Sequence, residues 1–429
     1  MLTREQNELL CRVAGDAPMG GIMRRHWLPV CMSEEVAARD GAPVRSRLLG
    51  EDLVVFRDSN DRLGVLGEYC LHRRASLAFG RNEECGLRCL YHGWKFDVAG
   101  NVVDMPSEAP GAAERLGKKT KAYPAREAGG FVWIWMGPQD EMREFAPPAW
   151  APQPGIKYAI VKMWTDCNWA QVLEGSIDSA HSSTLHSTNM PAAEDVYGST
   201  ATDEAWLRPS NDKAPRLLFE ATAYGFRYAA IRKPIKNPET HQYVRTTLFI
   251  APFTVLIPPN NRFNLAQMLV PIDDVNTMFY WIAWHPDPAK GITQDAWRKF
   301  CAAEVGVDVD ANYRKKRTLA NNYLQDREAM QRGDWTGIKG IPAQDMAMWE
   351  SMGRITERSE DHFGSSDLAV AQFRRMMVAA AQKFAAGGAA IGTTEPTPHV
   401  KLASFEGVVP KSVDWRTLGV PTEEATTAK

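Results

Sequence analysis

The stretch CLHRRASLAFGRNEECGLRCLYHGW, residues 70–94, contains two short segments that each place a histidine close behind a cysteine. Cys70 and His72 form the first segment, and Cys89 and His92 form the second. Two thiolates and two neutral imidazoles are the ligand set of a two-iron, two-sulfur centre in which the cysteines bind one iron and the histidines the other. Imidazole ligands also raise the reduction potential of such a centre. The spacing therefore predicts an iron–sulfur electron relay held by two facing loops.

The same four side chains also suit a structural zinc ion, because a tetrahedral Cys₂His₂ site accepts them. Zinc sites of that type usually pair cysteine with cysteine and histidine with histidine at short spacing, and this stretch does not. Cys85 lies inside the connecting segment, four residues before Cys89, and we interpret it as a spare thiol. The other cysteines have no ligand partner nearby in the sequence: Cys11, Cys31, Cys167 and Cys301.

Short apolar runs separated by turn residues surround this stretch and predict a small β domain. They include Leu53–Phe56, Leu63–Leu66 and Phe131–Met136, with a turn at Asp58–Asp61. Upstream, Thr3 and Gln6 form a potential capping box for a leading helix. The proline-rich residues 147–155 cannot sustain a helix or a central strand. We therefore expect an iron–sulfur domain over residues 1–150, with N-terminal helices, and a second domain over residues 151–429.

The second domain combines strand-like and helical patterns. Strands are expected at Leu217–Ala221, Phe226–Ile231, Val244–Ile250 and Met278–Trp284. Helices are expected around Gln171–His186 and after the capping residues Ser366 and Asp367, the latter ending at Gly387. The predicted fold class is therefore α+β, with a mainly antiparallel sheet in the second domain.

A second metal-binding pattern lies in residues 168–186. On an ideal helix Glu174, Asp178 and His181 share one face, whereas His186 lies about 140° round the helix from His181. Both imidazoles can reach one metal only if the helix loosens or ends between them. Two histidines and one carboxylate on one side of a metal are the ligands of non-haem ferrous oxygenases. The pattern thus predicts a mononuclear iron site with His181 and His186 as ligands.

The third ligand must be a carboxylate from elsewhere in the chain. Periodicity does not choose among the acidic residues that follow the predicted sheet. The candidates are Asp326, Asp345, Glu350 and Asp361.

Composition excludes some classes of protein. Fifty basic residues against 52 acidic ones give a net charge of −2, so there is no overall basic field to hold a nucleic acid. The first 30 residues lack a signal pattern, and the apolar runs are too short to span a bilayer. We therefore expect a cytoplasmic protein with no nucleic-acid or membrane partner.

Taken together, the two Cys/His segments and Glu174-x₃-Asp178-x₂-His181-x₄-His186 resemble the large (alpha) subunit of Rieske non-haem iron aromatic-ring-hydroxylating oxygenases. The resemblance covers nearly the whole chain. Within this family five segments are most similar to the phthalate dioxygenase branch. These segments are FGRNEE (79–84), YHGWKFD (91–97), MPSE (105–108), NDKAPR (211–216) and QDMAMWE (344–350). One departure is Arg74, where many members have glycine, and it puts only loop shape and reductase docking in doubt.

The resemblance implies an all-β Rieske domain followed by a helix-grip-like catalytic domain, in which helices cover an antiparallel sheet. It implies a [2Fe-2S] cluster on Cys70, His72, Cys89 and His92, and Fe(II) at a site whose carboxylate ligand is Asp345. The implied assembly is a homotrimer or a stacked hexamer of trimers, in which Asp178 bridges His181 of its own chain and His92 of the neighbouring chain.

The resemblance also implies the reaction. The chain would use O₂ to convert an aromatic carboxylate, phthalate or an isomer, to a cis-dihydrodiol. Electrons would come from a separate NADH-dependent reductase that carries flavin and an iron–sulfur centre. In agreement, no Gly-rich dinucleotide-binding fingerprint follows a strand in this chain.

A buried aromatic carboxylate needs a cation to offset its desolvation, and the fork of an arginine fits a carboxylate best. Arg245 alternates with pocket-type residues in its predicted strand, and Arg208 and Arg232 are further candidates. Ser179 adjoins Asp178 and completes the predicted substrate contacts.

Two other functions remain open at this point. A Rieske monooxygenase that removes methyl groups from methoxybenzoates, or cleaves phenoxybenzoate-type ethers, would use the same metals. A protein with only an electron-transfer or structural zinc role would not account for His181 and His186.

Overall fold

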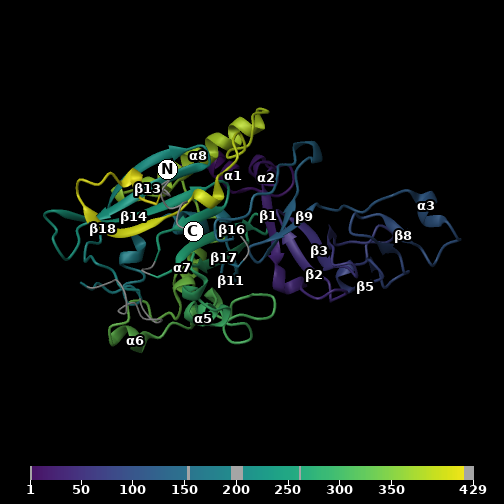
Figure 1. Ribbon diagram of the computed structural model, residues 1–429, viewed down its shortest axis with the longest axis horizontal. Helices are drawn as coiled ribbons and strands as arrows, with labels where there is room; N and C mark the ends of the chain where they lie inside the picture. Colours follow the sequence, from purple (N-terminus) through teal and green to yellow (C-terminus); the bar gives the residue numbers. More distant parts are fainter. Residues whose placement is uncertain (1, 152–154, 195–205, 260–261, 420–429) are drawn as a thin grey trace. The chain divides into compact units, whose positions relative to one another are not determined.

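The computed structural model describes residues 2–151, 155–194, 206–259 and 262–419 (Figure 1). The chain divides into two compact units, one of Val13–Ala146 and the other of Met1–Arg12 with Pro147–Lys429. The proline-rich residues 152–154 of the expected boundary lie outside the described residues. Within the described part of the chain, no helix is both long and apolar enough to cross a membrane.

The unit Val13–Ala146 is built from three small antiparallel sheets, which confirms the predicted all-β first domain. Their strand orders are β1-β10-β9, β2-β3-β4 and β5-β6-β7-β8. The elements are α2 (Pro18–Arg24), β1 (Trp27–Met32), β2 (Val44–Leu48), β3 (Glu51–Arg57), β4 (Leu63–Gly67), β5 (Arg81–Glu83), β6 (Gly86–Arg88), β7 (Lys95–Phe96), β8 (Val102–Asp104), α3 (Ala112–Leu116), β9 (Ala125–Ala128) and β10 (Phe131–Trp135).

The turn between β3 and β4 shows how local chemistry sets these strands. Asp58 Oδ1 accepts hydrogen bonds from the N–H groups of Asn60 and Arg62, at 3.0 and 2.8 Å. Asp61 adopts a φ of 66°, in the left-handed region that aspartate tolerates better than most residues. The predicted turn is therefore present, and it brings β4 back antiparallel to β3.

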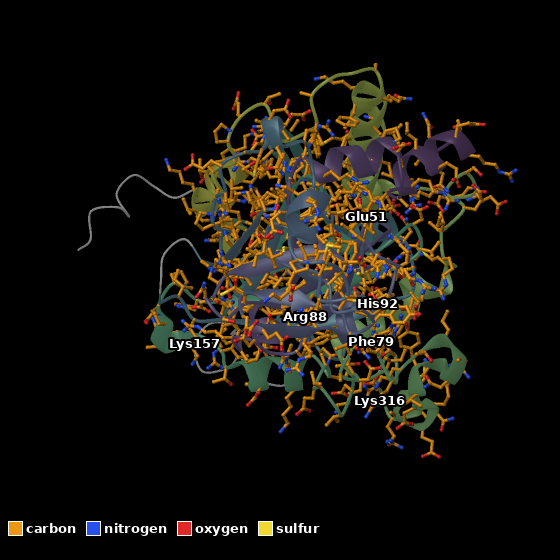
Figure 2. All side chains as sticks on the ribbon, turned by 90° about the vertical axis from the view of Figure 1, so that its right-hand side faces the viewer. Glu51, Phe79, Arg88, His92, Lys157 and Lys316 are labelled. Atoms are coloured by element: carbon orange, nitrogen blue, oxygen red, sulfur yellow. The ribbon has the colours of Figure 1, made fainter. Side chains whose placement is uncertain are left out.

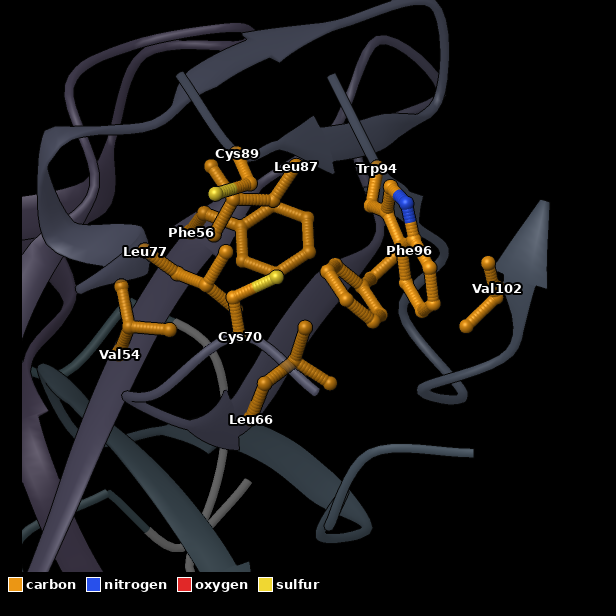
Figure 3. Packing of buried hydrophobic residues seen from close by; sticks show 10 residues of the cluster. All are labelled: Val54, Phe56, Leu66, Cys70, Leu77, Leu87, Cys89, Trp94, Phe96 and Val102. Carbon is orange, nitrogen blue, oxygen red and sulfur yellow. The ribbon is translucent and has the colours of Figure 1, made fainter. Parts of the chain in front are cut away.

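The core of this unit lies under the two Cys/His loops. Figure 3 shows Cys70 and Cys89 packed with Phe56, Leu77 and Leu87, all of them almost fully buried. Because these apolar side chains close the inner side of the loops, both sulfur atoms are held away from bulk water.

The second unit is organised around one eight-stranded sheet, and the antiparallel pairing of its strands is as predicted. Its order is β11-β17-β16-β15-β14-β13-β12, and β18 also pairs with β14. The strands are β11 (Tyr158–Thr165), β12 (Arg216–Thr222), β13 (Gly225–Arg232), β14 (His241–Ile250), β15 (Thr254–Ile257), β16 (Asn264–Pro271), β17 (Thr277–Trp284) and β18 (Phe405–Pro410). The four strands expected from the sequence correspond to β12, β13, β14 and β17, and the other four were not predicted.

Helices pack against this sheet and against one another. Helix α4 packs on β15 and β16, α7 packs on α4, and α8 packs on β12. The helices of the unit are α1 (Arg4–Cys11), α4 (Trp169–Ser176), α5 (Gln294–Phe300), α6 (Arg327–Gln331), α7 (Ile341–Ser351) and α8 (Leu368–Ala385). The predicted α8 begins after Asp367, as expected.

Helix α1 differs from the expected division of the chain. The capping box of Thr3 and Gln6 is present, but α1 packs on α4 and α8 of the second unit. Asn7 donates to the carbonyl oxygen of Thr356 at 2.9 Å and accepts from Arg358 at 2.9 Å. These hydrogen bonds explain why residues 1–12 group with the second unit and not with residues 13–146.

Candidate active site and metal centres

The two Cys/His loops close with the same pattern of backbone hydrogen bonds. In each loop the cysteine N–H donates to the fifth residue along, and its carbonyl oxygen accepts from the fourth. Arg74 and Gly93 are the fourth residues, and both have positive φ, 61° and 77°. The bonds are Cys70 to Ala75 (2.9 Å), Arg74 to Cys70 (3.0 Å), Cys89 to Trp94 (2.8 Å) and Gly93 to Cys89 (3.0 Å). The loops are thus two copies of one turn.

The four candidate cluster ligands line one small pocket. The rings of His72 and His92 lie 4.4 Å apart, and His72 stacks on Trp94 at 4.9 Å. Burial and the neighbouring Cys89 thiol raise the pKa of Cys70 to about 11, although backbone N–H groups oppose the shift. His72 Nδ1 is buried without a hydrogen-bond partner among the described residues. Two sulfurs and two imidazoles that face one space, with a buried nitrogen left unpaired, fit a metal cluster.

The mononuclear site follows a helix that is shorter than predicted. Helix α4 ends at Ser176 and not near His186, so Asp178 and His181 do not share a regular helical face with Glu174. Asp178 Oδ1 accepts from the N–H of Ala180 at 2.7 Å, and this local bond competes with helix continuation. Glu174 instead pairs with buried arginines, Arg358 and Arg374, at 2.8 Å each.

The end of α4 allows both histidines to face one carboxylate. His186 Nε2 lies 3.0 Å and His181 Nε2 lies 3.5 Å from Asp345 Oδ1. One potential ligand atom from each of the three residues lies within 4.8 Å of the others. Asp345 Oδ1 is buried and accepts no hydrogen bond from the described residues. An acceptor oxygen and two imidazole nitrogens that converge in this way fit a divalent cation.

The other candidate carboxylates are engaged elsewhere. Asp326 caps α6 by accepting from Ala329. Asp361 pairs with Arg374 at 2.7 Å, and Glu350 pairs with Lys315 at 2.6 Å. The structure therefore brings only Asp345 among the four beside His181 and His186.

A polar side chain lies near the other ring nitrogen of each histidine. His186 Nδ1 lies 2.7 Å from Gln344 Oε1, so a proton on Nδ1 leaves Nε2 free to bind a metal. His181 Nδ1 lies 3.4 Å from Asp178 Oδ2. Although burial opposes ionisation of Asp178, its contacts with His181 and with the Ala180 N–H lower the pKa of Asp178. Gln344 was not assigned this role from the sequence, although it directly precedes Asp345.

A cavity adjoins the three candidate iron ligands. Ser179 and Arg245 line the cavity, as does the apolar side chain of Trp281. Arg208 does not line the cavity itself, but it donates to Ser182 Oγ, which does, at 3.0 Å. It also donates to Ser183 Oγ at 2.8 Å.

Arg245 is already paired within the protein. Its Nη1 donates to Glu406 Oε1 at 2.5 Å and to Tyr243 Oη at 3.1 Å. Glu406 lies directly opposite Arg245 because β18 pairs with β14. Sequence reasoning missed Glu406, since this pairing is known only from the structure.

Comparisons with known proteins agree with this organisation. The Rieske [2Fe-2S] domain family matches residues 26–124, and the family described as LigXa C-terminal domain like matches residues 134–429. The chain therefore belongs to the Rieske non-haem iron oxygenases. It is an oxygenase subunit of these oxidoreductases, whose catalytic site carries mononuclear iron in addition to the [2Fe-2S] cluster.

Two relatives that the chain matches over nearly their full length indicate which branch of the family it is similar to. The chain is 57% identical to the phthalate 4,5-dioxygenase oxygenase subunit of Pseudomonas putida, over 97% of this chain and 94% of the relative. It is 36% identical to the 3-chlorobenzoate-3,4-dioxygenase oxygenase subunit of Comamonas testosteroni, over 97% of this chain and 98% of the relative. The fold is similar to that of dicamba monooxygenase, with a TM-score of 0.57, 18% identity, and coverage of 85% of this chain and 98% of that structure.

Proposed function

We propose that the chain is the oxygenase component of a dioxygenase that converts phthalate, or a closely similar benzene dicarboxylate, to a cis-dihydrodiol. The observation that carries the proposal is the cavity where His181, His186 and Asp345 adjoin the arginine-bearing wall of β14. The 57% identity to a phthalate 4,5-dioxygenase subunit supports the same substrate class. The electrons would come from an NADH-dependent flavin and iron–sulfur reductase, in the cytoplasm.

In this proposal Cys70, Cys89, His72 and His92 hold the cluster, while His181, His186 and Asp345 hold the iron. The bound iron supplies the activation of O₂. Gln344 keeps the proton of His186 on Nδ1, so that Nε2 is the metal ligand. Three protein ligands leave coordination positions open for O₂.

The proposed role of the cavity wall is to orient the ring and exclude water. Arg245 and the hydroxyl of Ser179 bind the carboxylates from the wall, and Arg208 adds positive charge from behind Ser182 and Ser183. The apolar side chains of Trp281 and Leu265 face the ring. A charged group in such a pocket requires a paired cation, because an unpaired buried carboxylate is costly.

We further propose that the working assembly is a trimer, or a stacked pair of trimers, in which the cluster of one subunit serves the iron of the next. Leu71, Leu90 and Tyr91 are 39%, 60% and 55% exposed, and they flank the cluster histidines. His92 and the exposed Phe79 are labelled in Figure 2. Such apolar exposure around an electron-transfer edge suits a protein partner. In the assembly, Asp178 would join His181 to His92 of the adjacent subunit.

A substrate screen tests the proposal. The purified protein is combined with an NADH-dependent ferredoxin-type reductase and supplied with phthalate, isophthalate, terephthalate or a methoxybenzoate. Mass spectrometry should detect a cis-dihydrodiol from a dicarboxylate, with NADH consumed in a one-to-one ratio. Formaldehyde from the methoxybenzoate, without dihydrodiol from any dicarboxylate, would identify a demethylase instead.

Replacing Arg245 by Met tests the substrate contact. We expect kcat/KM for the best dicarboxylate to fall by an amount on the order of 2 kcal/mol or more, because a buried carboxylate loses its partner. Arg227→Met is the matched control, since Arg227 lies on the neighbouring strand β13 and pairs with Glu220. Unchanged KM and kcat in a folded Arg245→Met protein would exclude Arg245 from substrate binding.

A further inference from the structure

Three arginines with almost no solvent exposure lie around the wall that Ser179 and Arg245 contribute to the cavity. Arg208, Arg232 and Arg245 are 3%, 1% and 8% exposed. Arg232 donates to the Ser179 carbonyl oxygen at 2.7 Å and to the Ser179 hydroxyl at 3.2 Å. Arg208 and Arg232 both donate to Ser183 Oγ, at 2.8 and 3.2 Å. The three guanidinium groups therefore form one cluster, which is joined to the cavity wall through serines.

This cluster contains one compensating carboxylate. Glu406, whose side chain is 4% exposed, pairs with Arg245. Among the residues that the structure describes, no carboxylate lies within ion-pair distance of Arg208 or Arg232. The Nε atoms of both arginines are also buried without a hydrogen-bond partner there. Of the nearby acidic groups, Asp178 lies against His181, and Asp345 lies against His181 and His186.

The pKa shifts agree with mutual repulsion inside the cluster. Burial, with the positive charges of Arg208 and Arg245, lowers the pKa of Arg232 to about 10. Burial and the charge of Arg245 likewise lower the pKa of Arg208. For Arg245 burial has the same sign, but Glu406 and Tyr243 outweigh it and raise the pKa. Arginine stays protonated in proteins at neutral pH, so the described residues give this cluster a surplus of two positive charges.

Glu406 also determines which part of Arg245 is free. The strand register places Glu406 opposite Arg245, so both side chains are on one face of the sheet. Glu406 and the Tyr243 hydroxyl engage only Nη1 of Arg245. The Nη2 and Nε groups have no hydrogen-bond partner among the described residues, and Arg245 lines the cavity. The guanidinium is thus anchored by one nitrogen and can present the others to a ligand.

We propose that Glu406 is a positioning and specificity-determining residue that sets the charge of ligand accepted by this cavity. By cancelling one of three buried positive charges and anchoring Nη1 of Arg245, it leaves a site matched to a dianion. The inference rests on the proposed function, since it assumes that the ligand is an aromatic carboxylate. It adds that the cavity discriminates between ligands of one shape by their charge.

The test measures binding without turnover, by anaerobic calorimetry on the iron-loaded protein at about pH 8, where carboxylic acids are ionised. Phthalate and 2-carbamoylbenzoate are the central pair, because they have nearly the same shape but carry two charges and one. Benzene-1,2,4-tricarboxylate adds a third charge. In the wild-type protein phthalate should bind most tightly of the three.

Glu406→Gln keeps the acceptor oxygen for Arg245 and Tyr243 but removes the negative charge. The affinity ratio of phthalate to 2-carbamoylbenzoate should rise about tenfold, because each additional ligand charge then meets one more unbalanced positive charge. The tricarboxylate should gain even more relative to the amide. Glu220→Gln is the matched control, since Glu220 pairs with Arg227 on β13 and does not line the cavity. It should keep the wild-type ratio.

Glu406→Asp retains the charge but shortens the side chain, so Arg245 loses part of its anchor. All affinities should fall, while the ratio of phthalate to the amide stays within about twofold of wild type, since the charge is unchanged. If Glu406→Gln does not fold, the affinity ratio measured in Glu406→Asp is used as the test. An unchanged ratio in folded Glu406→Gln, or a changed ratio in Glu406→Asp, would overturn the role of Glu406. Failure of the wild-type protein to bind any aromatic carboxylate would instead reject the proposed function.

Discussion

The two candidate metal centres are assembled differently. The candidate cluster ligands all lie in residues 70–92, on two loops that repeat one hydrogen-bond pattern. The candidate iron ligands come from the segment after α4 and from α7, which are far apart in the sequence. The first site therefore depends mainly on local turns, whereas the second depends on how α7 packs against α4.

This difference predicts different sensitivities. A local loop fixes its ligands through its own backbone, so distant substitutions should leave the cluster unchanged. The candidate iron site has one of its three residues on a separate helix, and Gln344 and Asp178 lie beside its histidines. Changes in these supporting side chains should therefore alter the iron site while the cluster spectrum stays the same.

The largest effect is expected from Asp345→Ala. Wild-type protein should contain about three irons and two acid-labile sulfides per chain, from one cluster and one mononuclear site. The variant should contain two irons, show no turnover and keep the wild-type Rieske spectrum, because its ligands are separate from those of the cluster. Metal analysis and optical spectroscopy provide the measurement.

Asp326→Ala is the matched control for Asp345→Ala. It removes another of the four candidate carboxylates, but Asp326 is exposed and caps α6. This variant should keep all three irons and lose only the stability of a cap, about 1 kcal/mol. Full iron retention in Asp345→Ala would assign the third ligand to another residue, and stoichiometric zinc at the Cys/His loops would reject the cluster.

The next largest effect is expected from Asp178→Asn, which tests the only connection proposed between the two centres. The variant should retain both metals and the oligomer, because Asp178 is not one of the three proposed ligands. Electron transfer from the reduced cluster to the iron should slow by orders of magnitude in a single-turnover experiment, since the bridge loses its negative charge. Wild-type rates with both sites fully loaded would show that no such bridge operates.

The comparison also explains what the sequence could reveal. Spacing alone located the candidate cluster ligands, because loops this short determine which side chains can meet. Spacing did not identify Asp345 as the third iron ligand, because four carboxylates were equally good candidates. Only the family resemblance distinguished Asp345 from the other three. The extent of α4 was predicted wrongly, because helical periodicity does not show the competing hydrogen bond that the Ala180 N–H donates to Asp178.

Other contacts required the tertiary structure. Gln344 meets His186 only because α7 packs beside the end of α4. Glu406 meets Arg245 only in the register observed between β18 and β14, and β18 was not predicted as a strand. The signals available beforehand were weak: a glutamine next to a candidate ligand, and an acidic residue in a short apolar run near the C-terminus.

A smaller effect is expected from Gln344→Leu, which removes the acceptor for His186 Nδ1 while keeping a side chain of similar size. Loss of such an orienting partner typically weakens metal binding by about 10- to 100-fold. Iron affinity, measured by competition with a chelator, should fall within this range while the cluster stays intact. Gln344→Glu should retain most of the affinity, because a carboxylate still accepts from Nδ1. Equal affinity in Gln344→Leu and wild type would remove Gln344 from the site.

The smallest effect is expected where the two cluster loops differ, at Arg74 and Gly93. Both have positive φ, but a Cβ at Gly93 would lie 2.4 Å from Pro106 Cγ, whereas Arg74 already carries a side chain and stacks its guanidinium on Tyr69 at 4.6 Å. Arg74→Gly relieves a left-handed backbone strain of about 1 kcal/mol. Two effects of Arg74→Gly are destabilising: the loss of a cation–π contact and the greater conformational entropy of the unfolded chain. Each costs about 0.5–1 kcal/mol.

These opposing contributions nearly cancel, so Arg74→Gly should change the stability of the cluster loops by less than about 1 kcal/mol. The urea midpoint for bleaching of the Rieske absorbance is the appropriate measurement, because a two-unit chain need not unfold in one step. Gly93→Ala, at the equivalent position, should lower that midpoint clearly. An alanine there would have a strained left-handed backbone, and its Cβ would clash with Pro106. If Arg74→Gly lowered the midpoint as much as Gly93→Ala, the Arg74 side chain would be an essential part of its loop, and the two loops would not be equivalent turns.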